Sequence, residues 1–117
     1  MLAAGGTLLA CAPFLHRIHG DPNDYGRYSE DYWVQALSTA GLHLMMLEHQ
    51  GLFYSVLVDF CKQYVDALWG RPLRDMARLP LAVAQVLVLR REQTRQVQSH
   101  PFLRSFTTGY GIVAVKE

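Results

Sequence analysis

The stretch at residues 13–28 holds most of the side chains that could take part in chemistry. It contains two histidines, two arginines and several Asp and Tyr residues among Gly, Pro and Asn, a composition that predicts a loop. Long irregular loops are uncommon in compact domains and are often functional. His16 and His19 are candidates for proton transfer, because imidazole titrates near neutral pH. The competing interpretation is that His19 only fixes the loop by hydrogen bonds to an Asp or to the backbone.

Asp24 and Arg27 lie three residues apart, just before a predicted helix. This spacing indicates an Asp-capped turn with the arginine folded back onto the carboxylate. The alternative is that Arg27 or Tyr28 contacts a bound small molecule. Both interpretations can hold together, because the wall of a substrate site has to be an ordered loop.

Other reactive side chains form no recognisable site. A metal site at His16, His19 and Asp21 is not favoured, because their spacing matches no standard ligand set. Cys11 and Cys61 are too far apart in the sequence for a metal motif and make no disulfide framework. Each cysteine is predicted to be a small buried apolar residue. The sequence shows no phosphate-loop motif, and no Ser-His-Asp or Cys-His arrangement can be argued from it.

Three apolar segments predict strands that would position the loop. Residues 7–12 and 42–48 are apolar on both faces, which is typical of interior strands of a parallel sheet under helices. The stretch 107–116 predicts a final strand. Between the first two strands, Ser29 predicts the N-cap of a helix and Gly41 its C′ position. In the second strand, the alternation assigns Leu42, Leu44 and Met46 to one side and Met45 and Leu47 to the other.

The segment at residues 51–103 predicts helices. An apolar stripe over residues 52–69 repeats through five turns, and Gly70 and Pro72 are expected to end this helix. A second helix is expected from about 80 to 96. We expect the two helices to pack on each other and on the sheet edge. The alternatives are a lid or subunit interface, and peripheral contact with a membrane.

Composition and charge limit the class of protein. The 117 residues are 50% hydrophobic and 18% charged, which fits one globular domain or part of one. The net charge of +1 predicts neither a nucleic-acid partner nor strong attraction to a membrane. No apolar run reaches transmembrane length, and a cytoplasmic location is expected. Arginines nevertheless concentrate in the second half, where they form either a solvated face or a surface for an anionic partner.

Two parts of the chain resemble a known family. The first part comprises Gly5-Gly6-Thr7-Leu8, Pro13-Phe14 and the run from His19 to Ser29, HGDPNDYGRYS; the second comprises Gly41-Leu42 and the terminal Gly109-Tyr110 with Val113-Ala114-Val115-Lys116. The first part is similar to the pattern GG-x-L…P…H-x-x-P-x-D-Y-x-R-y-[ST] of many small-molecule class I S-adenosylmethionine-dependent methyltransferases. The resemblance identifies the chain as the C-terminal portion of such an enzyme.

The resemblance implies an α/β fold. The chain would form strands five, six and seven of a doubly wound, Rossmann-like sheet, with a helical insertion at about 51–103 before the last strand. Residues 1–117 would then be a partial methyltransferase domain. In that family the last strand is antiparallel beside the fifth, and the loop after the fifth strand lies beside the methyl acceptor. The resemblance therefore implies catalytic roles for His16 and His19 and acceptor contacts for Pro13, Phe14, Asp24, Arg27 and Tyr28.

The family's cofactor motif is not found in these residues. The family binds S-adenosylmethionine with a glycine-rich loop after its first strand and an acidic residue after its second. No G-x-G-x-G follows a strand in this sequence. We therefore assign no residue to the cofactor or to a metal, and expect an N-terminal half or a partner chain to supply the cofactor site.

The function expected from the sequence is methyl transfer to a small-molecule acceptor. This chain would perform it only when a cofactor-binding half completes it. The alternative is a non-catalytic remnant that acts as an oligomerisation or partner-binding module. If the first half is missing, the buried faces would lie partly bare and a homodimer is expected.

Overall fold

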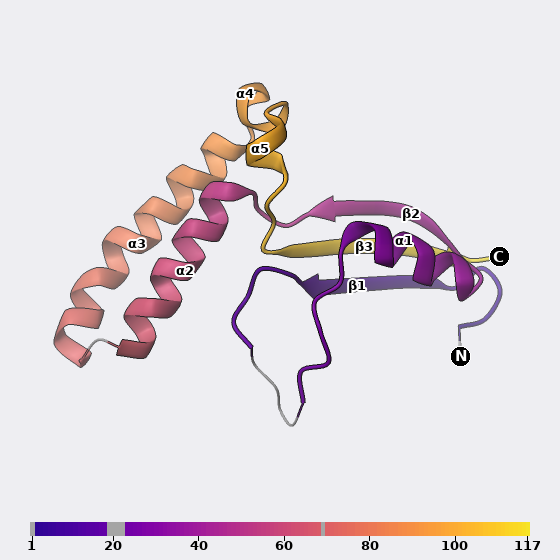
Figure 1. Ribbon diagram of the computed structural model, residues 1–117, viewed down its shortest axis with the longest axis horizontal. Helices are drawn as coiled ribbons and strands as arrows, with labels where there is room; N and C mark the ends of the chain where they lie inside the picture. Colours follow the sequence, from indigo (N-terminus) through magenta and orange to yellow (C-terminus); the bar gives the residue numbers. More distant parts are fainter. Residues whose placement is uncertain (1, 19–22, 69) are drawn as a thin grey trace. The chain divides into compact units, whose positions relative to one another are not determined.

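The computed structural model describes residues 2–18, 23–68 and 70–117, and of Leu68 only the backbone. The chain divides into two compact units (Figure 1). Residues 1–50 and 109–117 form the first, named here the sheet unit. Residues 51–108 form the second, named here the helical unit.

The sheet unit holds three strands in one sheet. They are β1 (Thr7–Pro13), β2 (Leu42–His49) and β3 (Gly109–Lys116), in the order β1-β3-β2. β3 lies between the other two and is antiparallel to both (Figure 1). The prediction that the opening, middle and terminal segments form one sheet is thus confirmed. Pro13 pairs with Gly109 and His49 with Tyr110, so the carboxyl ends of β1 and β2 meet at one rim of the sheet.

The helix α1 (Glu30–Thr39) has the predicted bounds. Its N-cap is Ser29, whose Oγ accepts a hydrogen bond from the backbone N–H of Tyr32 at 3.4 Å. Gly41 follows its end with a φ of 70°, a left-handed conformation that glycine adopts without strain. Leu37 of this helix is buried against the sheet, in a core that contains Tyr110, Ile112 and Ala114 of β3.

The prediction that the first two strands are interior strands of a parallel sheet is wrong. Along β1, exposed residues alternate with half-buried ones, and the Leu9 side chain is 74% exposed. β1 and β2 each pair only with β3 among the described residues, so both are edge strands. The structure shows a mixed α/β unit with a three-stranded antiparallel sheet, and its strand order does not establish a Rossmann-like sheet.

The predicted alternation of β2 is also wrong in its second half. The pairing with β3 shifts between Leu44 and Met46, which leaves Met45 without a residue opposite it. Such a β-bulge puts two residues of one strand against one of its neighbour. Met45 and Met46 are therefore both exposed, and Leu47 takes the inward position that the alternation assigned to Met46.

The helical unit contains α2 (Phe53–Leu68), α3 (Arg71–Glu92) and two short helices, α4 (Arg95–Gln98) and α5 (Pro101–Arg104). α2 confirms the first predicted helix, but the predicted start of the second at Pro80 is wrong. The helix already begins at Arg71, because Pro72 occupies its first turn, where a missing N–H costs nothing. Pro80 lies inside it. Among the described residues, no helix is long and apolar enough to cross a bilayer.

Two glycines of β3 provide a test of the sheet. A Cβ added at Gly109 would lie 2.6 Å from the backbone oxygen of Ala12, an atom of β1 that can move only if the strand moves. Gly109→Ala is therefore expected to destabilise the sheet unit by about 2 kcal/mol in urea unfolding. Gly111→Ala is the matched control, since its Cβ would approach only the flexible side chain of Gln50 at 3.3 Å. Equal unfolding midpoints for the two variants would contradict this interpretation.

Candidate functional site

The candidate site lies at the rim where β1 and β2 end. Pro13 is the last residue of β1 and is exposed. Phe14 follows it, half-buried, with its ring 5.6 Å from that of Tyr110. Pro13 and Phe14, two of the residues expected to contact an acceptor, thus stand at the start of the loop and beside the first residues of β3.

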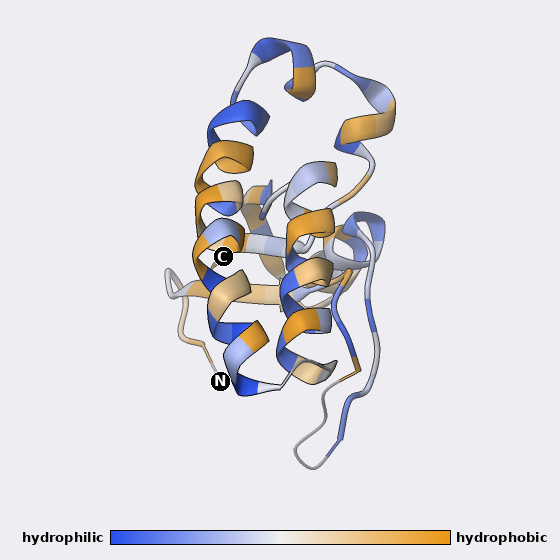
Figure 2. Ribbon diagram, turned by 90° about the vertical axis from the view of Figure 1, so that its left-hand side faces the viewer, coloured by the Kyte–Doolittle hydropathy of each residue, from blue (hydrophilic) through white to orange (hydrophobic). Residues whose placement is uncertain are grey.

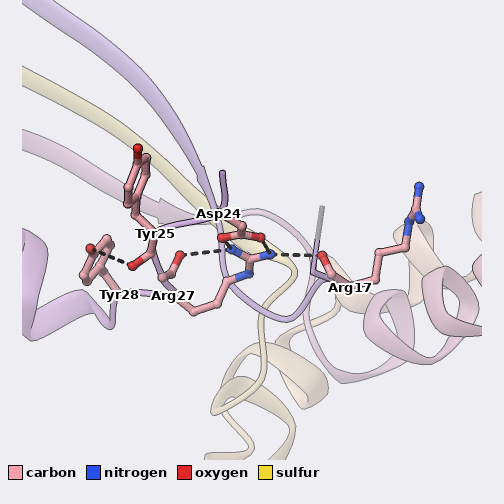
Figure 3. Close-up of polar contacts among 6 residues, drawn as sticks. Arg17, Asp24, Tyr25, Arg27 and Tyr28 are labelled. Atoms are coloured by element: carbon pink, nitrogen blue, oxygen red, sulfur yellow. Dashed lines mark hydrogen bonds and ion pairs between the residues drawn. The ribbon is translucent and has the colours of Figure 1, made fainter. Parts of the chain in front are cut away.

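Asp24 and Arg27 form the predicted turn, and the prediction that the arginine folds back is confirmed. Both terminal nitrogens of Arg27 bind the Asp24 carboxylate, Nη1 to Oδ1 at 2.5 Å and Nη2 to Oδ2 at 2.7 Å (Figure 3). This forked geometry is the strong form of an ion pair. The hydrogen bonds that Arg27 donates to Asp24 raise the pKa of Arg27 above its ordinary value, with a smaller Coulombic contribution from the same carboxylate.

Arg27 also joins two parts of the loop. Its Nη2 donates to the backbone oxygen of Arg17, ten residues earlier, at 3.0 Å (Figure 3). Its Nη1 donates to the backbone oxygen of Gly26 at 3.0 Å. The guanidinium therefore holds the outgoing and the returning arm of the loop together.

Tyr28 stands in a group of aromatic rings. Its ring stacks on that of Tyr32 with centroids 4.2 Å apart, and it meets the Trp33 ring edge-on at 5.9 Å. Its hydroxyl lies 3.4 Å from the backbone oxygen of Tyr25 (Figure 3). Since α1 positions two of these rings, the helix and the loop order one another.

Of the two histidines predicted to be catalytic, His16 lies within the described residues and His19 does not. His16 is half-buried in the loop, and its backbone N–H donates to the backbone oxygen of Phe14 at 3.1 Å. His19 lies outside the described residues, as does Asp21. Within the described part of the chain, no three His, Cys, Asp or Glu residues come together in a way that could hold a metal ion.

Sequence reasoning did not single out His49, Glu30 and Tyr110. His49 Nε2 lies 3.0 Å from Glu30 Oε2, and the imidazole meets the ring of Tyr110 edge-on at 5.4 Å. His49 ends β2, Tyr110 lies opposite it in β3, and Glu30 starts α1. The only signal in the sequence is the position of each residue at the end of an element, and it becomes informative only once the strand register is known.

The geometry suits His49 for holding α1 against the sheet. When Nε2 carries the proton, it donates to the Glu30 carboxylate and Nδ1 keeps its lone pair. Nδ1 is buried and has no hydrogen-bond partner among the described residues. The contact of Nε2 with Glu30 therefore makes His49 a positioning residue, which ties the end of β2 to the start of α1.

The expectation that both cysteines are buried is wrong. Cys11 and Cys61 are both exposed and neither forms a disulfide. Cys11 points to the sheet face opposite α1, because β1 alternates and its residues Leu8, Ala10 and Ala12 pack toward the core. Its Sγ accepts a hydrogen bond from Gln50 Nε2 at 3.3 Å.

The glycines of the sheet unit do not fit S-adenosylmethionine. Gly5 donates from its N–H to Lys116 O at 2.8 Å, and Gly6 O accepts from Lys116 N–H at 2.9 Å. Gly109 and Gly111 are paired with Pro13 and Cys11 of β1. Their backbone groups extend the sheet, whereas a nucleotide cradle needs N–H groups that point out of a turn. These four glycines therefore do not form such a cradle.

Burial of the Tyr110 hydroxyl gives a pH-dependent prediction. Burial raises the pKa of Tyr110 above its ordinary value, more than the hydrogen bond from the Glu30 backbone lowers it. The unfolded chain then loses this proton at a lower pH than the folded chain does. The sheet unit is thus expected to lose stability as pH rises above about 10. In urea unfolding, Tyr110→Phe should lessen that loss; identical pH slopes for the variant and the parent chain would contradict the assignment.

Comparisons of the chain with protein-family models, with curated proteins and with solved structures find no match.

Proposed function

We propose that this chain is the acceptor-side portion of a small-molecule, S-adenosylmethionine-dependent methyltransferase, active only when a cofactor-binding half completes it. One observation carries the proposal. β3 lies antiparallel beside β1, and the loop that carries Phe14, Asp24 and Arg27 follows the carboxyl end of β1. The resemblance implies this arrangement for the seventh strand, the fifth strand and the acceptor loop.

The role proposed for the loop is placement of the acceptor. Methyl transfer requires alignment of the acceptor with the methyl group and, for some acceptors, removal of one proton. Phe14 and Tyr28 provide ring faces at the rim, and the Asp24–Arg27 fork fixes the loop that carries Tyr28. His16 is the candidate for accepting the proton in this scheme; His19 has the same role on sequence grounds alone.

The test is a titration of the isotope-labelled chain followed by NMR, with S-adenosylhomocysteine and with panels of small phenols, amines and carboxylic acids. S-Adenosylhomocysteine alone is expected to move no amide signal. Members of one acceptor panel should move the signals of Phe14, His16 and Tyr28. Strong binding of S-adenosylhomocysteine would refute the missing cofactor site, and an acceptor panel that never affects the loop would refute the acceptor role.

The exposed side of the sheet supports a second candidate function, a non-catalytic oligomerisation or partner-binding module. The face of β1 turned away from the core carries Leu9 and Cys11, both exposed, and β1 has no second neighbour among the described residues. Unpaired strand edges and bare apolar faces favour association. Analytical ultracentrifugation distinguishes this candidate: it predicts a dimer that Leu9→Lys dissociates, whereas a monomer at all concentrations would exclude self-association.

A further inference from the structure

The helical unit carries apolar side chains on the outside of α3. Met76, Leu79, Val83 and Val86 are all more than half exposed, and Met76 and Leu79 reach 75% and 73%. Their spacing of three, four and three residues places them along one face of the helix. These four residues are named here the α3 ridge.

The α3 ridge faces away from α2. The half-buried or buried residues of α3 recur at the alternate helical spacing, at Arg74, Ala77, Leu81, Ala84, Val88 and Glu92. On a helix of 3.6 residues per turn, these positions and the ridge lie on opposite sides. Within the helical unit, the inward residues of α3 pack and the ridge is left exposed.

Polar contacts run between the two helices. Lys62 Nζ of α2 donates to Gln85 Oε1 of α3 at 2.9 Å, and Arg78 of α3 lies 3.8 Å from Asp66 of α2. Leu57, Phe60 and Tyr64 of α2 are meanwhile exposed. Orange, apolar segments recur along both helices in Figure 2. These polar contacts are exposed, and apolar residues such as Val56, Val65 and Leu81 are buried or half-buried in the unit. The helices nevertheless leave further apolar side chains on their outer surface, and exposed apolar patches mark interaction sites.

Charge distinguishes α3 from α2 as the docking element. α3 carries five arginines and two acidic residues, and one of those acids, Glu92, is buried. α2 carries one lysine and two aspartates. The helical unit as a whole has eight basic and four acidic residues, a net charge of +4, whereas the sheet unit has three and six, a net charge of −3. The chain's small overall charge thus conceals a basic unit.

Arginines also border the α3 ridge. Arg90 continues the row of the ridge four residues after Val86, and Arg71, the first residue of α3, lies five residues before Met76. Neither makes an ion pair among the described residues. An apolar stripe bordered by long cationic side chains is the pattern of helices that lie in the headgroup layer of anionic membranes, because the guanidinium groups reach the headgroups while the apolar residues enter the acyl boundary.

We propose that the α3 ridge and its flanking arginines dock the chain on the surface of an anionic lipid bilayer, with α3 lying in the plane of the surface. This is a further property of the chain, and it holds whether or not the proposed methyl transfer is correct. It favours peripheral contact with a membrane, one of the alternatives that the sequence leaves open for these helices, although the overall net charge predicts no strong attraction to a membrane.

The test is flotation of the full chain with vesicles of phosphatidylcholine alone and of an equal mixture of phosphatidylcholine and phosphatidylglycerol. We expect binding to the mixed vesicles only, weakened by high salt. Neutralising Arg71 and Arg90 to glutamine should weaken binding about thirtyfold, at roughly fivefold for each arginine. Leu79→Asp with Val83→Asp should weaken it by at least about a hundredfold.

Control variants test whether the loss of binding is specific to the α3 ridge and its arginines. Phe60→Asp places one negative charge on an exposed apolar position of α2 and is compared with Leu79→Asp alone; Lys116→Gln removes one positive charge from the sheet unit and is compared with Arg90→Gln alone. Both control variants should bind like the parent chain. Far-UV circular dichroism confirms that the ridge variants keep their helices, as expected for outward positions. Equal binding to neutral vesicles, no binding to either kind, or equal loss with Phe60→Asp would each overturn the proposal. If the chain instead self-associates through the ridge, and Leu79→Asp abolishes that association, the partner of the ridge is a second copy of the chain and not a membrane.

Discussion

Glu92→Ala is expected to destabilise the helical unit by about 3 kcal/mol, because this carboxylate caps the start of α2 from within another helix. Glu92 is 4% exposed. Its Oε2 accepts from the Leu52 N–H at 3.0 Å and the Ser55 hydroxyl at 2.6 Å, and its Oε1 accepts from the Ser55 N–H at 2.8 Å. Alanine leaves these donors at the end of a helix without acceptors, and the positive end of the helix dipole without its counter-charge.

Urea unfolding followed by circular dichroism measures this effect. Glu92→Gln keeps one acceptor oxygen but no charge, so its free energy of unfolding should lie between those of the alanine variant and the parent chain. Asp75→Ala is the matched control, since it removes a carboxylate from the same helix that is exposed and paired only with the exposed Arg78. That substitution should lower the free energy of unfolding by less than about 0.5 kcal/mol. If Glu92→Ala and Asp75→Ala unfold alike, the cap does not stabilise α2.

The parts of the fold that the sequence predicts well are those with local signals. α1 starts and ends where Ser29 and Gly41 place it, because a hydroxyl cap and a left-handed glycine act within one turn of the helix. The predicted final strand is likewise found at β3. The Asp24–Arg27 turn was predictable for the same reason, since the two residues that make it are three positions apart.

The errors concern features that depend on distant residues. The residues near Pro80 do not show that a helix has already begun at Arg71. That start depends on Pro72, which could equally well mark the end of α2. The bulge at Met45 follows from pairing with β3, more than sixty residues later. His49 and Glu30 meet because α1 packs on the sheet, and Glu92 reaches α2 across forty residues. The sequence near Glu92 gives no local signal for that contact.

Arg27→Lys is expected to release the loop while leaving the strands intact. A lysine keeps the charge, but a single ammonium cannot bind both carboxylate oxygens of Asp24 and the backbone oxygen of Arg17 in one plane. We expect the amides of residues 14–18 and 23–28 to exchange with deuterium at least about tenfold faster, since loops held by few contacts open at little cost. The unfolding midpoint of the sheet unit should hardly change, because the bonds of the guanidinium to Asp24, Gly26 and Arg17 lie within the loop.

The same variant links the loop to the proposed function. If the loop places an acceptor, Arg27→Lys should weaken the binding of the acceptor panel that moves the Phe14 and Tyr28 signals, by roughly tenfold. Asn23→Ala is the control, because among the described residues its side chain donates to the exposed hydroxyl of Tyr25, at 3.2 Å, and not to the Asp24–Arg27 pair. If the loop amides exchange faster but ligand binding is unchanged, the role of Arg27 is structural only. That result would count against an acceptor site at this rim. Unchanged exchange would show that the aromatic group around Tyr28 orders the loop without the ion pair.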